Sequence, residues 1–152
     1  MVTYKEAQAV VDTVINSVQA GNDIVIDSQE ISLASSYIGQ DVQIRDYFLG
    51  RMGENLPELN MVLLTLIRGM GDNSNLRSLY AVAQFESGAS EEALATLKSA
   101  RESDPDNTMV NLLGRVITAG WSVESFGQMR TELHPKVVAQ LATLANETIG
   151  DN

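Results

Sequence analysis

The chain has 152 residues, no cysteine and a formal net charge of −10, which suits one domain with its own hydrophobic core. The missing cysteines exclude disulfides, thiolate metal sites and a cysteine nucleophile, and they fit a reducing compartment. Because the ten lysines and arginines are scattered, the basic stripe that nucleic-acid binding requires is absent.

Residues 3–21 predict the first helix. Thr3 and Glu6 form a capping box, in which each side chain bonds the backbone N–H of the other residue. Apolar residues then recur at helical spacing until Gly21, which ends the helix.

A short connector and a second helix follow. The apolar run Ile24-Val25-Ile26 could be a strand, but on its own it favours an extended connector that packs on the core. Asp27 or Ser28 can cap the second helix, which carries an apolar face and ends at Gly39.

Two further helices are expected before residue 72. Asp41 can cap the first of them, and Gly50 and Gly53 mark its end. Pro57 suits the first turn of the next, which is apolar on nearly all sides, so we expect it to be the most buried helix. The run Gly69-Met70-Gly71 lacks the strand, third glycine and lysine of a phosphate-binding loop, and therefore predicts a helix end and a turn.

Residues 75–105 carry the most specific pattern. A helix ends at Ser87-Gly88, and after a short turn Ser90 can cap a second helix, which Pro105 ends. The inward face of this second helix is small or apolar, with Ala93, Leu97 and Ala100. Alanines let two helices approach closely, and a glycine allows the tight turn between them.

Residues 88–107 resemble the second half of a tetratricopeptide repeat. The resemblance implies a pair of antiparallel helices joined by a tight turn. Because about three repeats are normally needed for a peptide-binding array, a hairpin used as core packing is the favoured interpretation. A protein-binding surface remains the alternative.

The last third of the chain predicts two more helices. The first ends at Gly120, and Trp121 follows it, either as a buried lid, which we favour, or as an exposed aromatic anchor. His134, beside Pro135, is expected to open the final helix. As the only histidine, it lacks the partners that acid–base catalysis or a metal site would need.

A second resemblance covers residues 24–121. The run 41–46, Asp-Val-Gln-Ile-Arg-Asp, and the later alanine and leucine series ending at Asp104-Pro105 resemble the actinobacterial domain of unknown function 4192 family, with Phe85 where that family usually has tryptophan. The α/β region with which members of that family begin has no counterpart here. The resemblance therefore implies the C-terminal helical half alone, either as a natural short version or as a domain excised from a larger protein. Any activity housed in the α/β half would not be visible in this sequence.

Together these patterns predict an all-α fold, a compact right-handed array of about seven to nine helices in a single domain over residues 1–152. There is no signal-peptide pattern, and no apolar run approaches the roughly 18–20 residues of a membrane span. We expect a cytoplasmic protein that binds neither nucleic acid nor membranes, and no motif indicates a cofactor or a metal ion.

The leading functional hypothesis is a non-enzymatic interaction or scaffold domain. It predicts a contiguous apolar patch, or a groove beside Phe85 and Trp121. The candidate protein-binding residues are Phe85, Trp121, Arg77 and Arg115. A protein partner and a homo-oligomer both fit the sequence.

The rival hypothesis is an enzyme or a small-ligand-binding protein. No nucleophile motif or carboxylate pair indicates catalysis, so its pocket would have to consist of ordinary polar side chains. The candidates are Arg45, Asp46, Tyr80 and Arg115. This hypothesis predicts that they converge in one deep pocket.

Overall fold

A computed structural model describes residues 1–21 and 28–150, and over these residues the chain forms eight α-helices. The predicted all-α fold is confirmed. Apart from helices, the described residues contain one isolated antiparallel bridge, between Thr3 and Thr148. The helices are α1 (Tyr4–Gln19), α2 (Ser28–Gln40), α3 (Val42–Met52), α4 (Pro57–Arg68), α5 (Ser74–Glu86), α6 (Ser90–Ser103), α7 (Thr108–Thr118) and α8 (Val123–Thr143).

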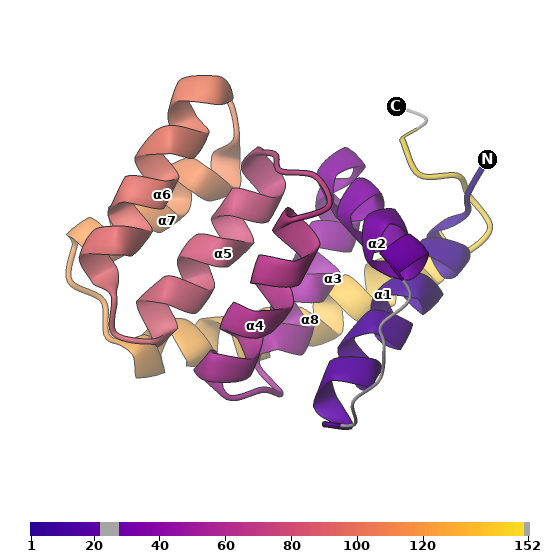
Figure 1. Ribbon diagram of the computed structural model, residues 1–152, viewed down its shortest axis with the longest axis horizontal. Coiled ribbons are helices and arrows are strands. Elements are labelled where there is room, and N and C mark those ends of the chain that lie inside the picture. The colour runs from indigo at the N-terminus through magenta and orange to yellow at the C-terminus, as the bar shows by residue number, and fades with distance from the viewer. Residues whose placement is uncertain (22–27, 151–152) are drawn as a thin grey trace.

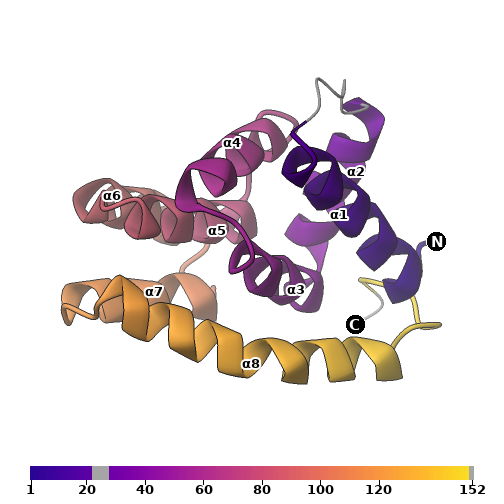
Figure 2. The same cartoon turned by 90° about the horizontal axis from the view of Figure 1, so that it is seen from below.

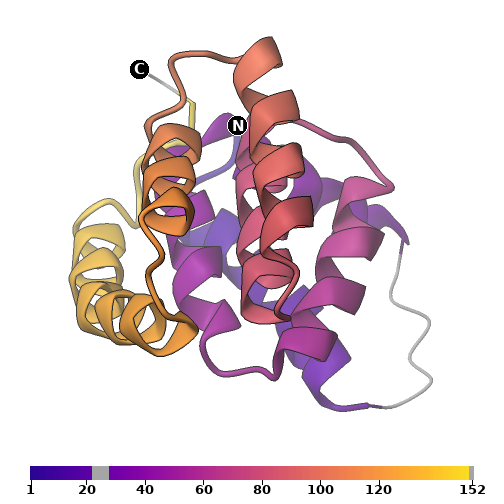
Figure 3. The same ribbon diagram turned by 90° about the vertical axis from the view of Figure 1, so that its left-hand side faces the viewer.

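Helix α5 lies in the middle of the molecule, with α6 and α7 on one side and α1, α2 and α3 on the other (Figure 1). Figure 2 shows α8 along one side, leading from α7 past α3 to α1, while α4 lies on the opposite side. Figure 3, seen from the end formed by α6 and α7, shows these two helices side by side. The start of α1 contacts the segment after α8, because the backbone N–H of Tyr4 donates to the carbonyl of Glu147 at 2.9 Å.

The capping box at the start of α1 is confirmed. Thr3 Oγ1 accepts from the Glu6 N–H at 3.1 Å, and the Glu6 carboxylate accepts from the Thr3 N–H at 3.4 Å. Helix α2 continues one residue beyond the predicted end at Gly39. The expected connector at Ile24-Val25-Ile26 lies outside the described residues.

Asp41 caps α3 as predicted, since its Oδ1 accepts from the N–H of Gln43 at 2.8 Å. Gly53 is the C-cap of α3, but the prediction that Gly50 also marks the helix end is wrong. Gly50 lies inside α3, where α8 passes so closely that a Cβ would collide with His134. Close packing, and not helix termination, explains that glycine.

The prediction that the fourth helix is the most buried is wrong. Only one face of α4 is covered, with Asn60, Leu63, Leu64 and Ile67 buried. Helix α5 takes the central place and buries eight residues, several of them small: Asn75, Leu76, Ser78, Leu79, Ala81, Val82, Ala83 and Phe85. Small side chains let neighbouring helices approach α5 on several sides, whereas the apolar composition of α4 did not reveal which of its faces has a neighbour.

Helices α5 and α6 pack as the predicted pair. The turn between them contains Gly88 at φ +86°, a conformation that favours glycine, and the alanines and leucine of the predicted inward face of α6 are buried. Ser90 is not the cap, however. The chain enters α6 one residue earlier, at Ala89, so Ser90 is already helical and makes no side-chain cap bond.

The prediction that His134 opens the last helix is wrong. Helix α8 begins at Val123, capped by Ser122, whose Oγ accepts from the N–H of Ser125 at 3.0 Å. Pro135 therefore lies inside α8. A proline removes one helical hydrogen bond, and α8 tolerates this loss because buried residues on both sides of Pro135 hold it to the core: Phe126, Arg130 and Leu141.

Candidate binding surfaces

The four polar residues proposed for a pocket lie in three separate places. Arg45 is buried in α3, where its Nε donates to Asp46 Oδ1 at 3.0 Å. Tyr80 lies on α5 with the guanidinium of Arg68 4.4 Å from its ring centroid. Arg115 is exposed on α7. The structure pairs Arg45 with Asp46 and does not bring the other two to them.

Arg45 belongs instead to a buried polar network around Asn75. The Asn75 side-chain oxygen accepts from Arg45 Nη1 at 3.1 Å and from Asn107 Nδ2 at 2.9 Å. Its Nδ2 donates to the carbonyls of Ile38 and Gly39 at the end of α2. The side-chain amide of Asn75 thus joins α2, α3, α5 and the start of α7. The arginine of the run 41–46, Arg45, therefore has a role in holding the fold together.

Asp41 is also engaged within the fold. While its Oδ1 caps α3, its Oδ2 accepts a hydrogen bond from the hydroxyl of Tyr4 at 2.5 Å. Burial, the hydrogen bond to Asp41 and the negative charge of that carboxylate raise the pKa of Tyr4 to about 12. This contact fixes the start of α1 against the start of α3.

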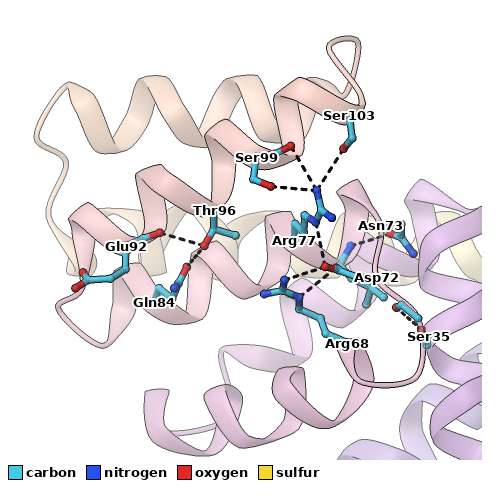
Figure 4. Close-up of polar contacts among 12 residues, drawn as sticks. Ser35, Arg68, Asp72, Asn73, Arg77, Gln84, Glu92, Thr96, Ser99 and Ser103 are labelled. Carbon is cyan, nitrogen blue, oxygen red and sulfur yellow. Dashed lines mark hydrogen bonds and ion pairs between the residues drawn. The ribbon is translucent and has the colours of Figure 1, made fainter.

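Arg77, a candidate protein-binding residue, is held by contacts within the chain (Figure 4). Its Nε donates to Asp72 Oδ2 at 3.1 Å, and its Nη1 donates to Ser99 Oγ at 3.2 Å and Ser103 Oγ at 3.4 Å. Burial opposes ionisation of Asp72, but the hydrogen bonds from Arg68 and Arg77 outweigh it and lower the pKa of Asp72. Arg77 therefore ties the turn before α5 to α6.

The two aromatic candidates for protein binding differ in exposure. Phe85 is only 5% exposed and packs edge-to-face on Phe126, with ring centroids 5.9 Å apart. Trp121 keeps 42% of its surface exposed in the turn between α7 and α8, so the favoured interpretation as a buried lid is wrong. High average burial of tryptophan does not decide the place of one that falls in a surface turn.

A groove of about 440 Å³ lies between α3 and α8, with one residue of α7 at its side. Its apolar lining consists of Leu49, Met109, Phe126, Met129, Leu133 and Val137. Its polar residues are Gln43, Asp46, Arg130, His134, Lys136 and Gln140. This volume and this mixed lining are typical of sites for small molecules.

Asp46 and Arg130, two charged residues of the groove lining, already have partners of opposite charge. Asp46 lies 2.9 Å from Arg45, and Glu86 accepts two hydrogen bonds from Arg130, at 2.6 and 2.8 Å. The side chains of Glu86 and Arg130 are each only 8% exposed. Lys136, by contrast, is exposed, and its ammonium makes no bond to any residue that the structure describes.

His134 of α8 packs against α3. Its ring lies 5.8 Å from the ring of Tyr47, and its Nδ1 is buried beside Gly50 without a hydrogen-bond partner among the described residues. The Nε of Arg130 is also buried without a partner there, and a Cβ on Gly53 would lie 3.1 Å from it. Two glycines of α3 thus make room for two side chains of α8.

A second feature is an apolar stripe on α4, on the side of the molecule opposite α8 (Figure 2). The α4 stripe consists of Leu56, Leu59, Val62, Leu66 and Met70. Leu59, Val62 and Leu66 are three or four residues apart within α4, which places them on one side of the helix. Leu56 is the N-cap residue of α4 and Met70 follows its C-cap, and all five except the half-buried Leu59 are exposed. A hollow of about 650 Å³ adjoins the stripe and is bordered by Glu54 and Glu58.

Sequence reasoning missed both surfaces. The walls of the groove come from residues 43–50, 109 and 126–140, which nothing in the local pattern connects. The α4 stripe did leave a signal, because a helix that is apolar on nearly all sides must either be enclosed or expose an apolar face. The buried Asn75 left no recognisable signal beyond its place at the start of a helix.

Two features are absent from the described part of the chain. Within residues 1–21 and 28–150, no helix has the length and apolar character needed to cross a membrane. Over the same residues, no three His, Asp or Glu side chains are grouped so that they could hold a metal ion.

Comparison with known proteins gives one match. Residues 3–123 match the family model described as "Domain of unknown function (DUF4192)". The match ends at the first residue of α8, so nearly all of that helix lies beyond it. No curated protein and no solved structure matches the chain.

Proposed function

Because the chain belongs to the family described as "Domain of unknown function (DUF4192)", whose description states no activity, we propose a function from its surfaces. The protein is a non-enzymatic, cytoplasmic interaction domain that docks on a protein partner through the α4 stripe. The observation that carries this proposal is the row of exposed apolar side chains along one side of α4.

Exposure of the α4 stripe to water is unfavourable in free energy. Burying apolar surface is worth about 25 cal/mol per Å², and a contiguous apolar patch on a soluble protein often marks an interaction site. Val62 is 54% exposed in the middle of the stripe, with Leu59 and Leu66 on either side. A partner that covers this row would gain free energy from several adjacent side chains.

Charge indicates the kind of partner. Glu54 and Glu58 border the stripe, and the whole chain carries a net charge of −10. A surface with an apolar row flanked by lysines or arginines would complement both features. Two copies of this chain would bring −10 against −10, so charge favours a different protein over a homo-oligomer.

The non-enzymatic part of the proposal is supported by the arrangement of the polar side chains. Arg45 and Asp46 are paired with each other, while Tyr80 and Arg115 lie elsewhere. Among the residues first considered for protein binding, Phe85 and Arg77 are occupied within the fold. Trp121 and Arg115 are exposed and remain candidates for a second contact.

We also propose that this domain is the C-terminal helical half of a larger actinobacterial protein and that α5 and α6 form a tetratricopeptide-like hairpin. What supports these proposals is the resemblance of residues 41–46 and 88–107 to the corresponding motifs. Sequencing the complete gene and its neighbours tests the first. A structural comparison of α5 and α6 with repeat proteins tests the second.

Site-specific photo-crosslinking tests the docking role of α4. A photoreactive amino acid replaces Val62 in the protein expressed in its own cells, and the matched control carries it at Val138, an exposed valine of α8. We expect one discrete adduct from position 62 and none of that size from position 138. An adduct at twice the mass of the chain would mean self-association, and equal adducts from both positions would contradict the proposal.

A further inference from the structure

We propose that the groove between α3, α7 and α8 binds a small amphiphile with an apolar tail and a carboxylate head. This site lies on the side of the molecule opposite the α4 stripe (Figure 2), so it goes beyond the proposed docking function and does not depend on it. The size of the groove, its apolar wall and the ammonium of Lys136, unpaired among the described residues, support this proposal.

The size and wall of the groove suit an aliphatic tail. At roughly 30 Å³ for each water molecule, 440 Å³ is the space of about 15 waters, and a ligand with a similar number of non-hydrogen atoms would fill it. Six apolar residues line this space, and two of them are methionines, Met109 of α7 and Met129 of α8. Methionine adapts its shape to an irregular or mobile apolar group.

The charges at the groove select the head group. Within the lining, Asp46 is paired with Arg45, so it is not free to bind a cation. Arg130 is likewise paired with Glu86, which lies outside the lining. The ammonium of Lys136 has no partner in the described part of the chain, which leaves a local positive charge on a protein with net charge −10. The side-chain amides of Gln43 and Gln140 line the same groove and can donate to a carboxylate.

The size of the groove also disfavours a partner helix. An α-helix with its side chains is about 10–12 Å across, so a groove of 440 Å³ could take one or two of its side chains and not the helix itself. A single small amphiphile uses the apolar wall and Lys136 together.

The test uses sodium decanoate, well below its micelle concentration, with the purified protein. We expect saturable 1:1 binding by calorimetry, with amide NMR shifts concentrated in the groove segments of α3 and α8. Lys136→Gln should weaken decanoate binding about two- to fivefold, the effect of losing one exposed ion pair. Lys5→Gln, at an exposed lysine of α1, should leave it unchanged, and decylamine should bind more weakly than decanoate.

A second pair of variants separates the groove from the rest of α8. Leu133→Glu places a charge in the apolar wall and should abolish decanoate binding, whereas Val138→Glu, at another exposed position of α8 outside the groove, should not. Both are surface changes, and circular dichroism confirms that each variant is folded. Non-saturable binding, shifts at the α4 stripe, or equal affinity for decylamine would each overturn the inference.

Discussion

Gly50 of α3 and His134 of α8 approach so closely that a Cβ at position 50 would lie 1.9 Å from His134 Nδ1. Real Cβ atoms essentially never approach another atom within 3.0 Å, so the missing side chain is a requirement of this packing. The two helices also meet where Gly53 leaves room for Arg130. Helix α8 is therefore fitted to α3 at specific positions, and one wall of the groove depends on that fit.

Gly50→Ala should destabilise the protein by about 1–3 kcal/mol, the usual cost of overpacking. The ring of His134 would have to move, and that cost exceeds the gain of about 1 kcal/mol in helix propensity. Urea denaturation measures the change. In the Gly50→Ala/His134→Ala double variant, most of the loss should be recovered.

Gly127→Ala is the matched control for this prediction. Gly127 lies inside α8, and a Cβ there would have no atom within 4 Å, so alanine should stabilise the helix by up to about 1 kcal/mol. If Gly50→Ala proved as stable as the wild type, the close fit of α3 and α8 would be disproved.

Glu86→Ala should destabilise the protein by about 3–5 kcal/mol, because it leaves Arg130 charged and buried without its partner. This is a large part of the about 5–15 kcal/mol that typically stabilises a domain. Glu86→Leu combined with Arg130→Leu removes both charges and should recover most of the loss. A double variant less stable than Glu86→Ala would show that the ion pair itself is strongly favourable.

Asn75→Leu should cost about 2–4 kcal/mol, since it removes the partner of Arg45 Nη1 and of two carbonyls of α2, and leaves Asn107 Nδ2 only its bond to Ser74. Gln128→Leu, an exposed position of α8, is the control and should change stability by no more than about 0.5 kcal/mol. Denaturant unfolding of both variants checks this. Equal stabilities would mean that the buried network contributes nothing.

Tyr4→Phe should change how stability depends on alkaline pH. The pKa of Tyr4 is about 12 in the folded protein and near 10 when unfolded, so the unfolded chain loses its proton first. The stability that this tyrosine contributes is present below pH 10 and is lost as the pH rises toward 12. Because burial and the bond to Asp12 also raise the pKa of Tyr47, part of the alkaline loss should remain in the variant.

Unfolding free energies measured from about pH 8 upward give the comparison. The wild type should lose stability more steeply than Tyr4→Phe, so the two curves converge at high pH. Parallel curves would mean that Tyr4 titrates normally and that its contact with Asp41 is weak.

Local features were predictable from the sequence. Thr3, Asp41 and Pro57 begin their helices as expected, because a cap depends on atoms within four residues of one another. The turn at Gly88 and the inward face of α6 were also predictable, since each follows from the residue type and helical spacing.

Features that depend on distant neighbours were not predictable. The apolar residues of α4 gave no sign that only one face would be covered. His134 was expected to open the last helix, which in fact begins at Val123. The burial of Phe85 depends on Phe126, 41 residues later in the chain. The groove also could not be predicted, because its walls come from three helices that only the tertiary fold brings together.

The most direct test of the proposed function is the native size of the protein in a gentle extract of its own cells. The wild type should elute in an assembly larger than the purified protein, and Val62→Glu/Leu66→Glu should elute at the size of the purified chain. Leu133→Glu, on the opposite side, should keep the larger size. If the α4 double variant stays in the assembly, or if the wild type elutes as a free chain, the account of α4 as a docking surface is contradicted.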